Sequence, residues 1–545
     1  MDNKNLIWSY QIANTFFSLG VKDICICPGS RNTPLVIAFS ENKNLNCTSH
    51  IDERSAGYYA LGIAKKNNRP SILISTSGTA VANFFPSVIE SSLSKTPLII
   101  ITADRPNYLL NTGENQTINQ HNIYGNYVRE FLDIGLPNTN VELLKQKITD
   151  AYTLCINNIP GPIHLNVPFE EPLVTKLINN TYYSGKKYDL SNNEIKDIKK
   201  TKIKNLKKSI IICGELHPDE NIDSILMLSE YLSAPILADP TSNIRYNRIH
   251  KNIISSYNLL LKNIDINPNH IIRFGKKPTS KILCNLISES SNVLLVDKHE
   301  LFNDNPTEFI RANFDHFKDY IIKSFNSIDD NPILNTLIKS QEKINSHINS
   351  FNIDKMMCEG ILIKDILNYA HPNSNIFIGN SMAIREMDDL TLNMNKRINI
   401  YSNRGASGID GLVSTSLGIS SASQSKNNIA ILGDLSFYYD MTSLAFASKL
   451  DISLKLFILN NNGGGIFKKL PISNLNYNQF EKYWITPPNL NLHDISKSFN
   501  IKYHEIKKLN DLKEVFKSSS GLEIIDCKID MNNDYKNEII KSFPY

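Results

Sequence analysis

Apolar runs alternate with stretches of helical spacing along roughly the first 180 residues of the chain. Four runs rich in Ile, Val and Leu each end in a loop-like segment: DICICPGS, SILISTSG, PLIIITADRP and PIHLNVP. Between them, RSAGYYALGIAKK and TAVANFFPSVIESSL have the spacing of helices. Near-continuous aliphatic runs are typical of strands buried on both faces, as in parallel sheets covered by helices. Ligands of such sheets bind beyond the carboxyl ends of the strands, where PGSR, TSGTA and ADRP lie.

The same alternation occurs twice more, after polar stretches at about residues 176–208 and 318–355. The later strand-like runs are SIIICGE, APILADP, HIIRFGKKP and NVLLVDK, then NIFIGNS, INIYSNRGASG, NIAILGDLS, LKLFILNNN and LEIIDCKID. The pattern therefore predicts an α/β protein with three Rossmann-like domains that share one layout and have mainly parallel sheets. The predicted domains are residues 1–180, 181–345 and 346–545.

Composition narrows the class of protein. With 41% hydrophobic and 21% charged residues, the chain is typical of a globular protein, and its net charge of +4 is too small to indicate nucleic-acid binding. No apolar run reaches the ~18–20 residues that cross a bilayer. The N-terminal MDNKNLIWSY does not resemble a signal peptide, so we expect a cytoplasmic protein. Most of the eight cysteines lie in apolar runs, and we expect them to be reduced structural thiols.

Arginine is scarce in this chain: only 12 of the 58 basic residues are Arg. Four of the twelve, Arg31, Arg105, Arg385 and Arg404, follow strand-like segments. Arg binds a carboxylate through two parallel hydrogen bonds, which Lys cannot do. These four positions therefore indicate a site for an anionic ligand, although each Arg by itself could simply end a strand or cap a loop.

A candidate metal site lies in the third predicted domain. Gly433 and Asp434 end one strand-like run, and 24 residues (436–459) separate the GDL triplet from Asn460 and Asn461. A strand–helix–strand path of that length returns to the same edge of a sheet. Asp434, Asn461 and a backbone carbonyl near Gly463 would supply three oxygens, leaving an octahedral Mg²⁺ or Mn²⁺ room for two phosphate oxygens and a water. The simpler interpretation of NNNGGG is a tight turn.

The spacing resembles the GDG…NN motif of the thiamin-diphosphate enzymes, although this chain has GDL in place of GDG. Further segments resemble one branch of them, the MenD family of 2-succinyl-5-enolpyruvyl-6-hydroxy-3-cyclohexene-1-carboxylate synthases, which acts in menaquinone and phylloquinone synthesis. These segments include CPGSRNTPL, IDERSAGYYALGIAK, TSGTAVANFFPSVIE, GENQTINQ, GNSMAIREMD and YSNRGASGIDGLVST. The resemblance extends from about residue 20 to 470 and is weakest in the middle domain.

This resemblance implies a transferase that decarboxylates 2-oxoglutarate and adds the succinyl-carbanion equivalent to isochorismate. The first domain would bind the pyrimidine of the cofactor and the third its diphosphate. Glu53 would hydrogen bond the aminopyrimidine and promote loss of the thiazolium proton. The alternative for Glu53 is an ordinary acidic residue in the first turn of a helix.

The resemblance also assigns further residues. Those expected to contact the cofactor are Glu53, Ser407, Ile409, Gly433, Asp434, Leu435, Ser436, Asn461, Gly463 and Ile466. Those expected to bind substrate are Ser30, Arg31, Arg105, Gln116, Lys281, Ser381, Arg385, Arg404, Phe467 and Leu470, with Arg31 also catalytic. The chain departs from the family pattern beside Lys281, where Ile282 stands in place of the Arg of some members.

In this family the site forms between two subunits, so the resemblance implies a homodimer or homotetramer in a bacterial cytoplasm or a plastid stroma. Two other functions stay open. One is another 2-oxo-acid decarboxylase or carboligase, such as an acetohydroxyacid synthase, whose acceptors are uncharged. The other is a non-catalytic binding protein with the same fold, which we would expect to lack Glu53 or a metal ligand.

Overall fold

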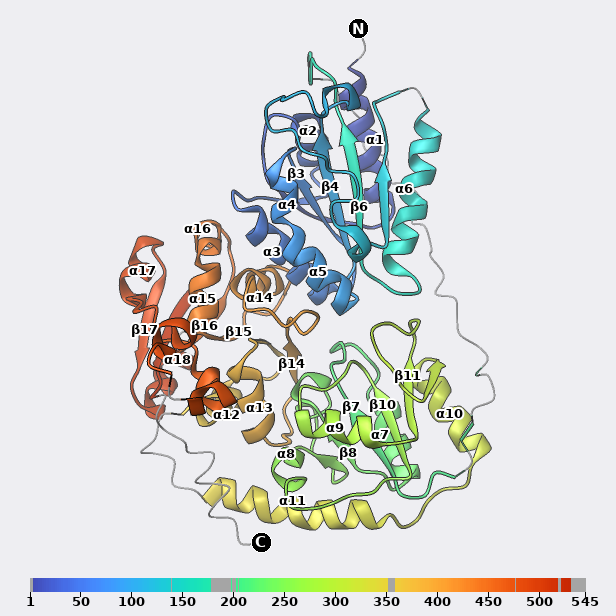
Figure 1. Ribbon diagram of the computed structural model, residues 1–545, viewed down its shortest axis with the longest axis vertical. Coiled ribbons are helices and arrows are strands. Elements are labelled where there is room, and N and C mark those ends of the chain that lie inside the picture. The colour runs from blue at the N-terminus through green and yellow to red at the C-terminus, as the bar shows by residue number, and fades with distance from the viewer. Residues whose placement is uncertain are drawn as a thin grey trace. The chain divides into compact units, whose positions relative to one another are not determined.

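The computed structural model describes residues 3–138, 140–177, 198, 202–203, 205–350, 358–475, 477–517 and 521–530. Most of the predicted polar stretch at 176–208 lies outside these residues, as does part of the stretch at 318–355. The chain forms two compact units. The first unit comprises Met1–Asn192, Asn403–Gln424 and Tyr439–Ile452, and the second comprises Asn193–Ser402, Ser425–Tyr438 and Ser453–Tyr545. Figure 1 shows the elements of both.

The first unit contains a six-stranded sheet in the order β2-β1-β3-β4-β6-β5, in which every pair is parallel. Its strands are β1 (Asp23–Ile26), β2 (Asn46–Ser49), β3 (Ser71–Ser75), β4 (Leu98–Asp104), β5 (Glu130–Asp133) and β6 (Pro162–Pro168). Its helices are α1 (Lys4–Ser18), α2 (Thr33–Ser40), α3 (Glu53–Asn67), α4 (Thr79–Asn83), α5 (Phe85–Ser94), α6 (Val141–Ile156), α14 (Leu412–Ser421) and α16 (Leu444–Ala447).

Alternate residues of the strands face two helical layers, because successive side chains of a strand point to opposite faces. Ile72, Ile74, Ile99 and Ile101 pack in one cluster with the apolar residues of α1, α2 and α6. Helix α3 lies against β1 and β3 and also contacts α5. Burial on both faces explains why these strands are near-continuous aliphatic runs.

Helix α14 packs on α3 at very short range, and glycines make this possible. A Cβ atom at Gly62 would lie 2.2 Å from the carbonyl oxygen of Thr415, and one at Gly418 would lie 2.1 Å from that of Tyr59. At both points the backbone of one helix therefore contacts a glycine of the other, which has no side chain to keep the helices apart. This contact positions the loop that precedes α14, which contains several of the candidate residues.

The second unit contains two further six-stranded parallel sheets. The strands of one are β7 (Ser209–Cys213), β8 (Ile236–Ala238), β9 (Ile253–Ile254), β10 (His270–Phe274), β11 (Val293–Asp297) and β12 (Glu308–Arg311). Its helices are α7 (Asp223–Tyr231), α8 (Tyr257–Leu260), α9 (Lys281–Glu289), α10 (Phe314–Ser324) and α11 (Pro332–Ser350). One face packs against α7 and α10 and the other against α8, α9 and α11 (Figure 1).

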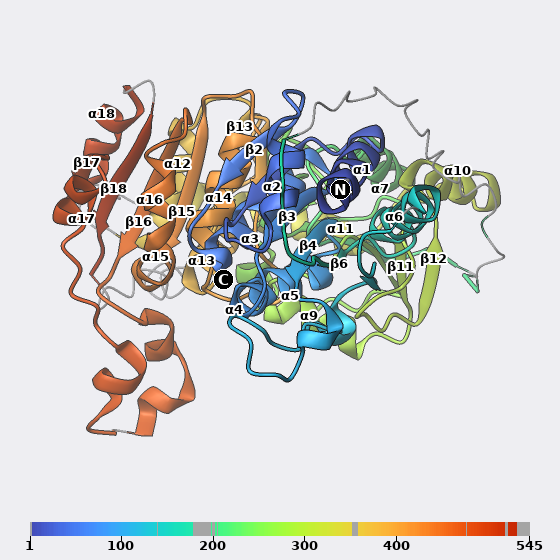
Figure 2. The ribbon, with the colours of Figure 1, turned by 90° about the horizontal axis from the view of Figure 1, so that it is seen from above.

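The third sheet has the order β14-β13-β15-β16-β18-β17. Its strands are β13 (Ser374–Ile378), β14 (Ile398–Tyr401), β15 (Asn428–Gly433), β16 (Leu454–Asn460), β17 (Lys502–Ile506) and β18 (Leu522–Lys528). Its helices are α12 (Glu359–Tyr369), α13 (Met382–Leu390), α15 (Asp434–Asp440), α17 (Leu492–Ser498) and α18 (Leu512–Lys517). After β16, short helical turns at Gly465–Lys469, Pro471–Leu475 and Glu481–Ile485 form an orange-red segment that projects beyond the sheet in Figure 2.

The first and third sheets have the same topology, since counting strands from the start of each gives the order 2-1-3-4-6-5. The middle sheet, counted in the same way, has the order 3-2-1-4-5-6, which is the doubly wound Rossmann order. The prediction of three α/β domains with parallel sheets is confirmed, and the structure adds that the strands of the middle sheet pair in a different order. The domain boundaries stay a prediction. All eight cysteines are free thiols, and no helix among the described residues is long and apolar enough to cross a membrane.

Candidate functional site

Two neighbouring strands of the third sheet end beside each other. Strand β15 ends at Gly433, α15 begins at Asp434, and β16 ends at Asn460. The strands are parallel, with Gly433 opposite Leu459 in the register. Asp434 and Asn461 therefore leave the sheet at the same edge, at the carboxyl ends of adjacent strands.

Asp434 is the central acidic residue of this edge. Its side chain is only 2% exposed, and its Oδ2 accepts a hydrogen bond from the backbone N–H of Gly463 at 2.8 Å, while Oδ1 accepts one from Leu435 at 2.7 Å. Burial raises the pKa of the Asp434 carboxyl to about 6, against the hydrogen bonds from backbone N–H groups, which lower it. Because burial disfavours the ionised form of Asp434, a bound cation would stabilise that form, which makes the Asp434 carboxylate a suitable ligand for a cation.

Asn461 presents an oxygen that lacks a partner. Its Nδ2 donates to Oε1 of Glu359 at 2.8 Å, and its Oδ1 is buried without a hydrogen-bond partner among the described residues. Burial, together with the charge of Glu386, raises the pKa of Glu359 to about 7. A nearby cation would favour the ionised form of Glu359. The unsatisfied oxygen of Asn461 and the carboxylate of Asp434 fit the expected divalent cation, for which both are suitable ligands.

The glycines of this edge have two different roles. A Cβ atom at Gly433 would meet nothing within 4 Å, so space lies open beside the end of β15. Gly463 and Gly464 are different, because a Cβ there would lie 2.3 Å from the carbonyl oxygen of Ile485 and 2.5 Å from that of Trp484. Close packing of the segment Glu481–Ile485 thus accounts for two of the three consecutive glycines.

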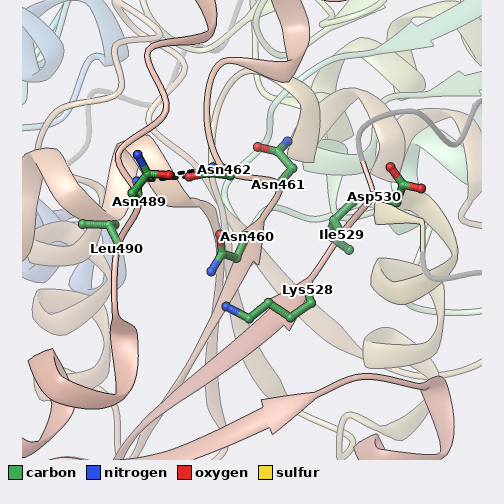
Figure 3. Close-up of a pocket in the computed structure, with 8 residues that line it drawn as sticks. All are labelled: Asn460, Asn461, Asn462, Asn489, Leu490, Lys528, Ile529 and Asp530. Atoms are coloured by element: carbon green, nitrogen blue, oxygen red, sulfur yellow. Dashed lines mark hydrogen bonds between the residues drawn. The ribbon is translucent and has the colours of Figure 1, made fainter.

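An open polar pocket of about 640 Å³ adjoins this edge. Figure 3 shows Asn460, which ends β16, and the two asparagines that follow it, together with Asn489 and Lys528. Asn462 and Asn489 hold the rim through two hydrogen bonds of 3.0 Å, one between side chains and one from the Asn489 backbone N–H to Asn462 Oδ1. The consecutive asparagines therefore have separate partners.

The candidates that follow β13 and β16 belong to the same unit. Ser381 precedes α13 with φ of 65°, and its backbone carbonyl accepts a hydrogen bond from Arg385. Arg385 and Leu470 are exposed, whereas Ile466 and Phe467 are partly buried in the turn Gly465–Lys469. Of the two α15 candidates, Ser436 is buried and Leu435 is partly buried. Strand β13 is the other neighbour of β15, so Ser381 also follows a strand at this edge.

Glu53 begins α3 in the first unit. The preceding residue, Asp52, caps the helix by accepting from the backbone N–H of Ser55 at 3.3 Å. Glu53 is partly buried, and its Oε2 accepts a long hydrogen bond of 3.5 Å from Nδ2 of Asn83. Because Asp52 already serves as the cap, the Glu53 carboxylate is not needed to satisfy the start of the helix.

The loop before α14 carries Arg404, Ser407 and Ile409. Glu90, which is 2% exposed, holds this loop by accepting from the backbone N–H groups of Gly405 at 2.9 Å and Ala406 at 2.7 Å. The far end is held by Asp410, which accepts from the Tyr58 hydroxyl at 2.6 Å. Ser407 has φ of 60°, and Ile409 is 40% exposed between these anchors. An apolar side chain is thus kept exposed on a fixed loop.

Two arginines predicted to bind substrate lie close together in the first unit. Burial lowers the pKa of Arg105, and the charge of Arg31 lowers it further. Arg31 donates to Oε1 of the exposed Glu171 at 2.8 Å, and Arg105 donates to the Ser77 hydroxyl. The Ser77 hydroxyl in turn donates to the backbone carbonyl of Gln116 at 2.9 Å. Two guanidinium groups whose charges repel each other favour the binding of an anionic ligand.

Ser30, Gln116 and Lys281 are exposed, and Ser30 directly precedes Arg31. Lys281 is the first residue of α9, on the second sheet. None of the contacts described in the structure joins Lys281 to another candidate residue, so its assignment stays a prediction.

Four acceptors or donors of the sites were not predicted from the sequence: Glu359, Asn83, Glu90 and Glu171. Glu90 carried a weak signal, since it is a lone charge within the small and apolar residues of SVIESSLS. Glu359 carried no signal beyond an acidic residue at a helix start, because its partner Asn461 is 102 positions away.

Comparison with known proteins identifies the class. The model of the N-terminal TPP binding domain of thiamine pyrophosphate enzymes matches residues 9–123, and that of the C-terminal TPP binding domain matches residues 387–523. The fold is similar to a solved benzoylformate decarboxylase from Polynucleobacter necessarius, with a TM-score of 0.73 over 96% of this chain and 98% of that one, at 16% identity. The chain is a thiamine pyrophosphate enzyme.

Relatives of similar length show to which family of these enzymes the chain belongs. A 2-succinyl-5-enolpyruvyl-6-hydroxy-3-cyclohexene-1-carboxylate synthase of Bacillus pumilus is 33% identical over 97% of this chain and 96% of its own. The enzyme of the same name from Listeria innocua is 35% identical over 95% of this chain and 93% of its own. The chain therefore belongs to the family of 2-succinyl-5-enolpyruvyl-6-hydroxy-3-cyclohexene-1-carboxylate synthases.

Proposed function

We propose that this protein decarboxylates 2-oxoglutarate and adds the resulting succinyl-carbanion equivalent to isochorismate, which yields 2-succinyl-5-enolpyruvyl-6-hydroxy-3-cyclohexene-1-carboxylate and CO₂. The observation that carries the proposal is similarity along almost the whole chain to synthases with that name. The rival carboligase, of the acetohydroxyacid synthase type, is not favoured by these relatives. Glu53, Asp434 and Asn461 are all present, which argues against a non-catalytic protein.

Thiamin diphosphate, when bound, supplies a nucleophilic carbon that also accepts the electron pair released by decarboxylation. In the proposed site, Mg²⁺ or Mn²⁺ would be held by Asp434, the Oδ1 of Asn461 and the backbone carbonyl of Gly463, and the diphosphate would occupy the open space beside Gly433. Ser436, Leu435 and Ile466 would line the same space. Ile409 would pack against the cofactor, with Ser407 beside it.

The Glu53 carboxylate is the proposed proton carrier. In its protonated form, Glu53 would hydrogen bond the pyrimidine ring at N1′ and hold the shared proton at that nitrogen. Its weak link to Asn83 leaves a carboxylate oxygen available for this bond. Because Asp52 caps α3, the Glu53 side chain is free to serve a ligand.

The substrates are both dianions, and the arginines account for their binding. Arg31 and Arg105 already repel each other, so a carboxylate placed between them would relieve that repulsion. Ser30 and Gln116 would contribute hydrogen bonds from the same unit, and Ser381, Arg385, Arg404, Phe467 and Leu470 would complete the substrate contacts. We also propose that Lys281, in helix α9 beside the middle sheet, contacts the substrate.

The test of this function is direct. The purified protein, incubated with thiamin diphosphate and Mg²⁺, should release CO₂ from 2-oxoglutarate and form the cyclohexene product only when isochorismate is present. Pyruvate replaces 2-oxoglutarate in the control. Turnover with pyruvate alone, or product without added thiamin diphosphate, would contradict the proposal.

We further propose that the active form is a homodimer or homotetramer, as the resemblance implies, which light scattering on the eluted protein would test. As the compartment we keep the bacterial cytoplasm or a plastid stroma, which cell fractionation would test.

A further inference from the structure

We propose that Glu359 is the positioning residue of the cation site: it orients the carboxamide of Asn461 so that the oxygen, and not the NH₂ group, faces the cation. The inference rests on the proposed function, since it concerns the cation that anchors the cofactor. It concerns a residue 75 positions before Asp434 in the chain, on helix α12.

The contacts on Asn461 decide its orientation. Asn461 Nδ2 donates to Glu359 Oε1 at 2.8 Å, and the ionised carboxylate, which a nearby cation favours, has only acceptor oxygens and so requires this orientation of the amide. The opposite atom, Oδ1, is then directed away from Glu359. It is buried and has no hydrogen-bond partner within the described parts of the chain. A buried acceptor left unsatisfied is expected where a ligand supplies the missing partner.

Glu359 is itself held in a fixed position. It is the first residue of α12, and the next residue, Gly360, packs so closely that a Cβ there would lie 3.0 Å from Oε2 of Glu386. Glu386 is 5% exposed and pairs with Lys469 at 3.0 Å. The charge of Glu386 is thus balanced by Lys469. Among the described residues, Asn461 is the one side chain that Glu359 hydrogen bonds.

Loss of the Glu359 acceptor would let the amide of Asn461 rotate and turn its NH₂ group towards the cation. Groups that orient metal ligands in this way typically contribute about 10–100-fold to metal affinity. Glu359→Met, which keeps the length of the side chain but removes the acceptor, should weaken cation binding by that factor. Glu359→Gln, whose carbonyl oxygen still accepts, should stay within about threefold.

The measurement is the binding of Mn²⁺ to the full chain in the presence of thiamin diphosphate, followed by the electron paramagnetic resonance signal of free Mn²⁺. The matched control is Asp526→Leu. Asp526 Oδ1 accepts from Nδ2 of Asn460 at 2.9 Å, so this variant removes the same kind of bond at the adjacent asparagine, together with the bonds of Asp526 Oδ2 to Tyr503 and Lys528. It should leave Mn²⁺ affinity within about twofold, since Asn460 is not a proposed ligand.

Exchanging the hydrogen-bond donor and acceptor between positions 359 and 461 distinguishes an effect on the orientation of the metal ligand from an effect on the stability of the protein. Asn461→Asp alone places two carboxylates against each other and should weaken Mn²⁺ binding by about tenfold or more. The double variant Glu359→Gln with Asn461→Asp restores a donor and an acceptor in reversed order, and it should recover most of the affinity. A residue with only a structural role would not show this rescue. Thermal unfolding of each variant confirms that it is folded.

Unchanged Mn²⁺ affinity in folded Glu359→Met, or no recovery in the double variant, would overturn the role of Glu359. If the unaltered protein binds Mn²⁺ with thiamin diphosphate but fails the turnover test above, the proposed function fails while this inference stands. If the unaltered protein binds no Mn²⁺ at all, the cation site itself is overturned.

Discussion

Glu53 begins α3 directly after its cap residue, Asp52, at a position where the helix dipole favours an acidic side chain whatever its function. The single residue is therefore ambiguous from sequence. The structure adds that Asp52 performs the capping and that Asn83, at 3.5 Å, is the one described side chain that hydrogen bonds Glu53. Because Glu53 is not needed to cap the helix, its carboxylate oxygens are available to accept hydrogen bonds from a ligand.

Glu53→Gln should leave the fold and the affinity for thiamin diphosphate unchanged but lower turnover by about 100-fold or more, because the amide cannot carry the proton. Calorimetry with thiamin diphosphate and Mg²⁺ measures the binding, and product formation measures the turnover. A variant that turns over at the original rate would refute the role of Glu53.

His164 in β6 illustrates how burial acts on one residue. It is 1% exposed, and burial lowers its pKa from 6.5 to about 3. The folded protein therefore favours the neutral imidazole. The stabilisation is fully present above pH 6.5, where both states are neutral, and is lost as the pH falls towards 3, since only the unfolded chain takes up the proton.

The free energy of unfolding should thus fall between pH 7 and 4.5 by about 2–3 kcal/mol on account of His164 alone, at about 1.4 kcal/mol per pH unit. His164→Gln should remove that part of the pH dependence. Urea unfolding at both pH values measures it. His493→Gln, which alters a half-exposed histidine, should keep the original dependence; the same slope in both variants would count against the prediction.

At the scale of elements, the contact between α3 and α14 brings together residues from distant parts of the sequence. Each helix has a glycine at the crossing. The backbone carbonyl of Thr415 lies against Gly62 of α3, and that of Tyr59 lies against Gly418 of α14. The contact holds the loop of Arg404, Ser407 and Ile409 in the same unit as Glu53, with Glu90 and Tyr58 as its anchors.

Gly418→Ala should destabilise this unit by about 1–3 kcal/mol, because its Cβ would lie 2.1 Å from the Tyr59 carbonyl oxygen and force the helices apart. Ser416→Ala on the same helix is the control. Its hydroxyl bonds only to Val413 within α14, so it should cost less than about 1 kcal/mol. Equal denaturant midpoints for the two variants would show that the helices do not need the close approach.

At the scale of the whole molecule, the chain forms two compact units, with Glu53 in one and Asp434 in the other. The family resemblance implies that a site combines these two residues from different subunits. Glu53→Gln and Asp434→Ala would each abolish activity, the second through loss of the cation and the cofactor.

Mixing the two inactive variants under subunit exchange should restore about a quarter of the original activity, because half of the dimers are mixed and each mixed dimer has one intact site. The turnover assay before and after mixing measures this. A mixture of each variant with itself is the control. If activity does not return although subunits exchange, the site is not shared in this way.

Local pattern was sufficient to predict much of the fold and the common sheet edge of Asp434 and Asn461. Aliphatic runs such as those of β3 and β4 predicted parallel strands because both faces are buried. The spacing between Asp434 and Asn461 predicted a common sheet edge because parallel strands end on the same side. The order of the middle sheet was not predictable, since strand pairing depends on contacts between remote segments rather than on the pattern of any one strand.

The sequence by itself determined the class of the protein, the three parallel sheets and the principal candidate residues, because these follow from periodicity, spacing and motif wording. Only the tertiary structure decided which groups hold those candidates in place. Glu359 on Asn461, Glu90 on the loop before α14 and Arg31 beside Arg105 all join positions far apart in the chain. Such contacts depend on folding in three dimensions, where hydrogen bonds and charges act over a few ångströms whatever the separation along the sequence.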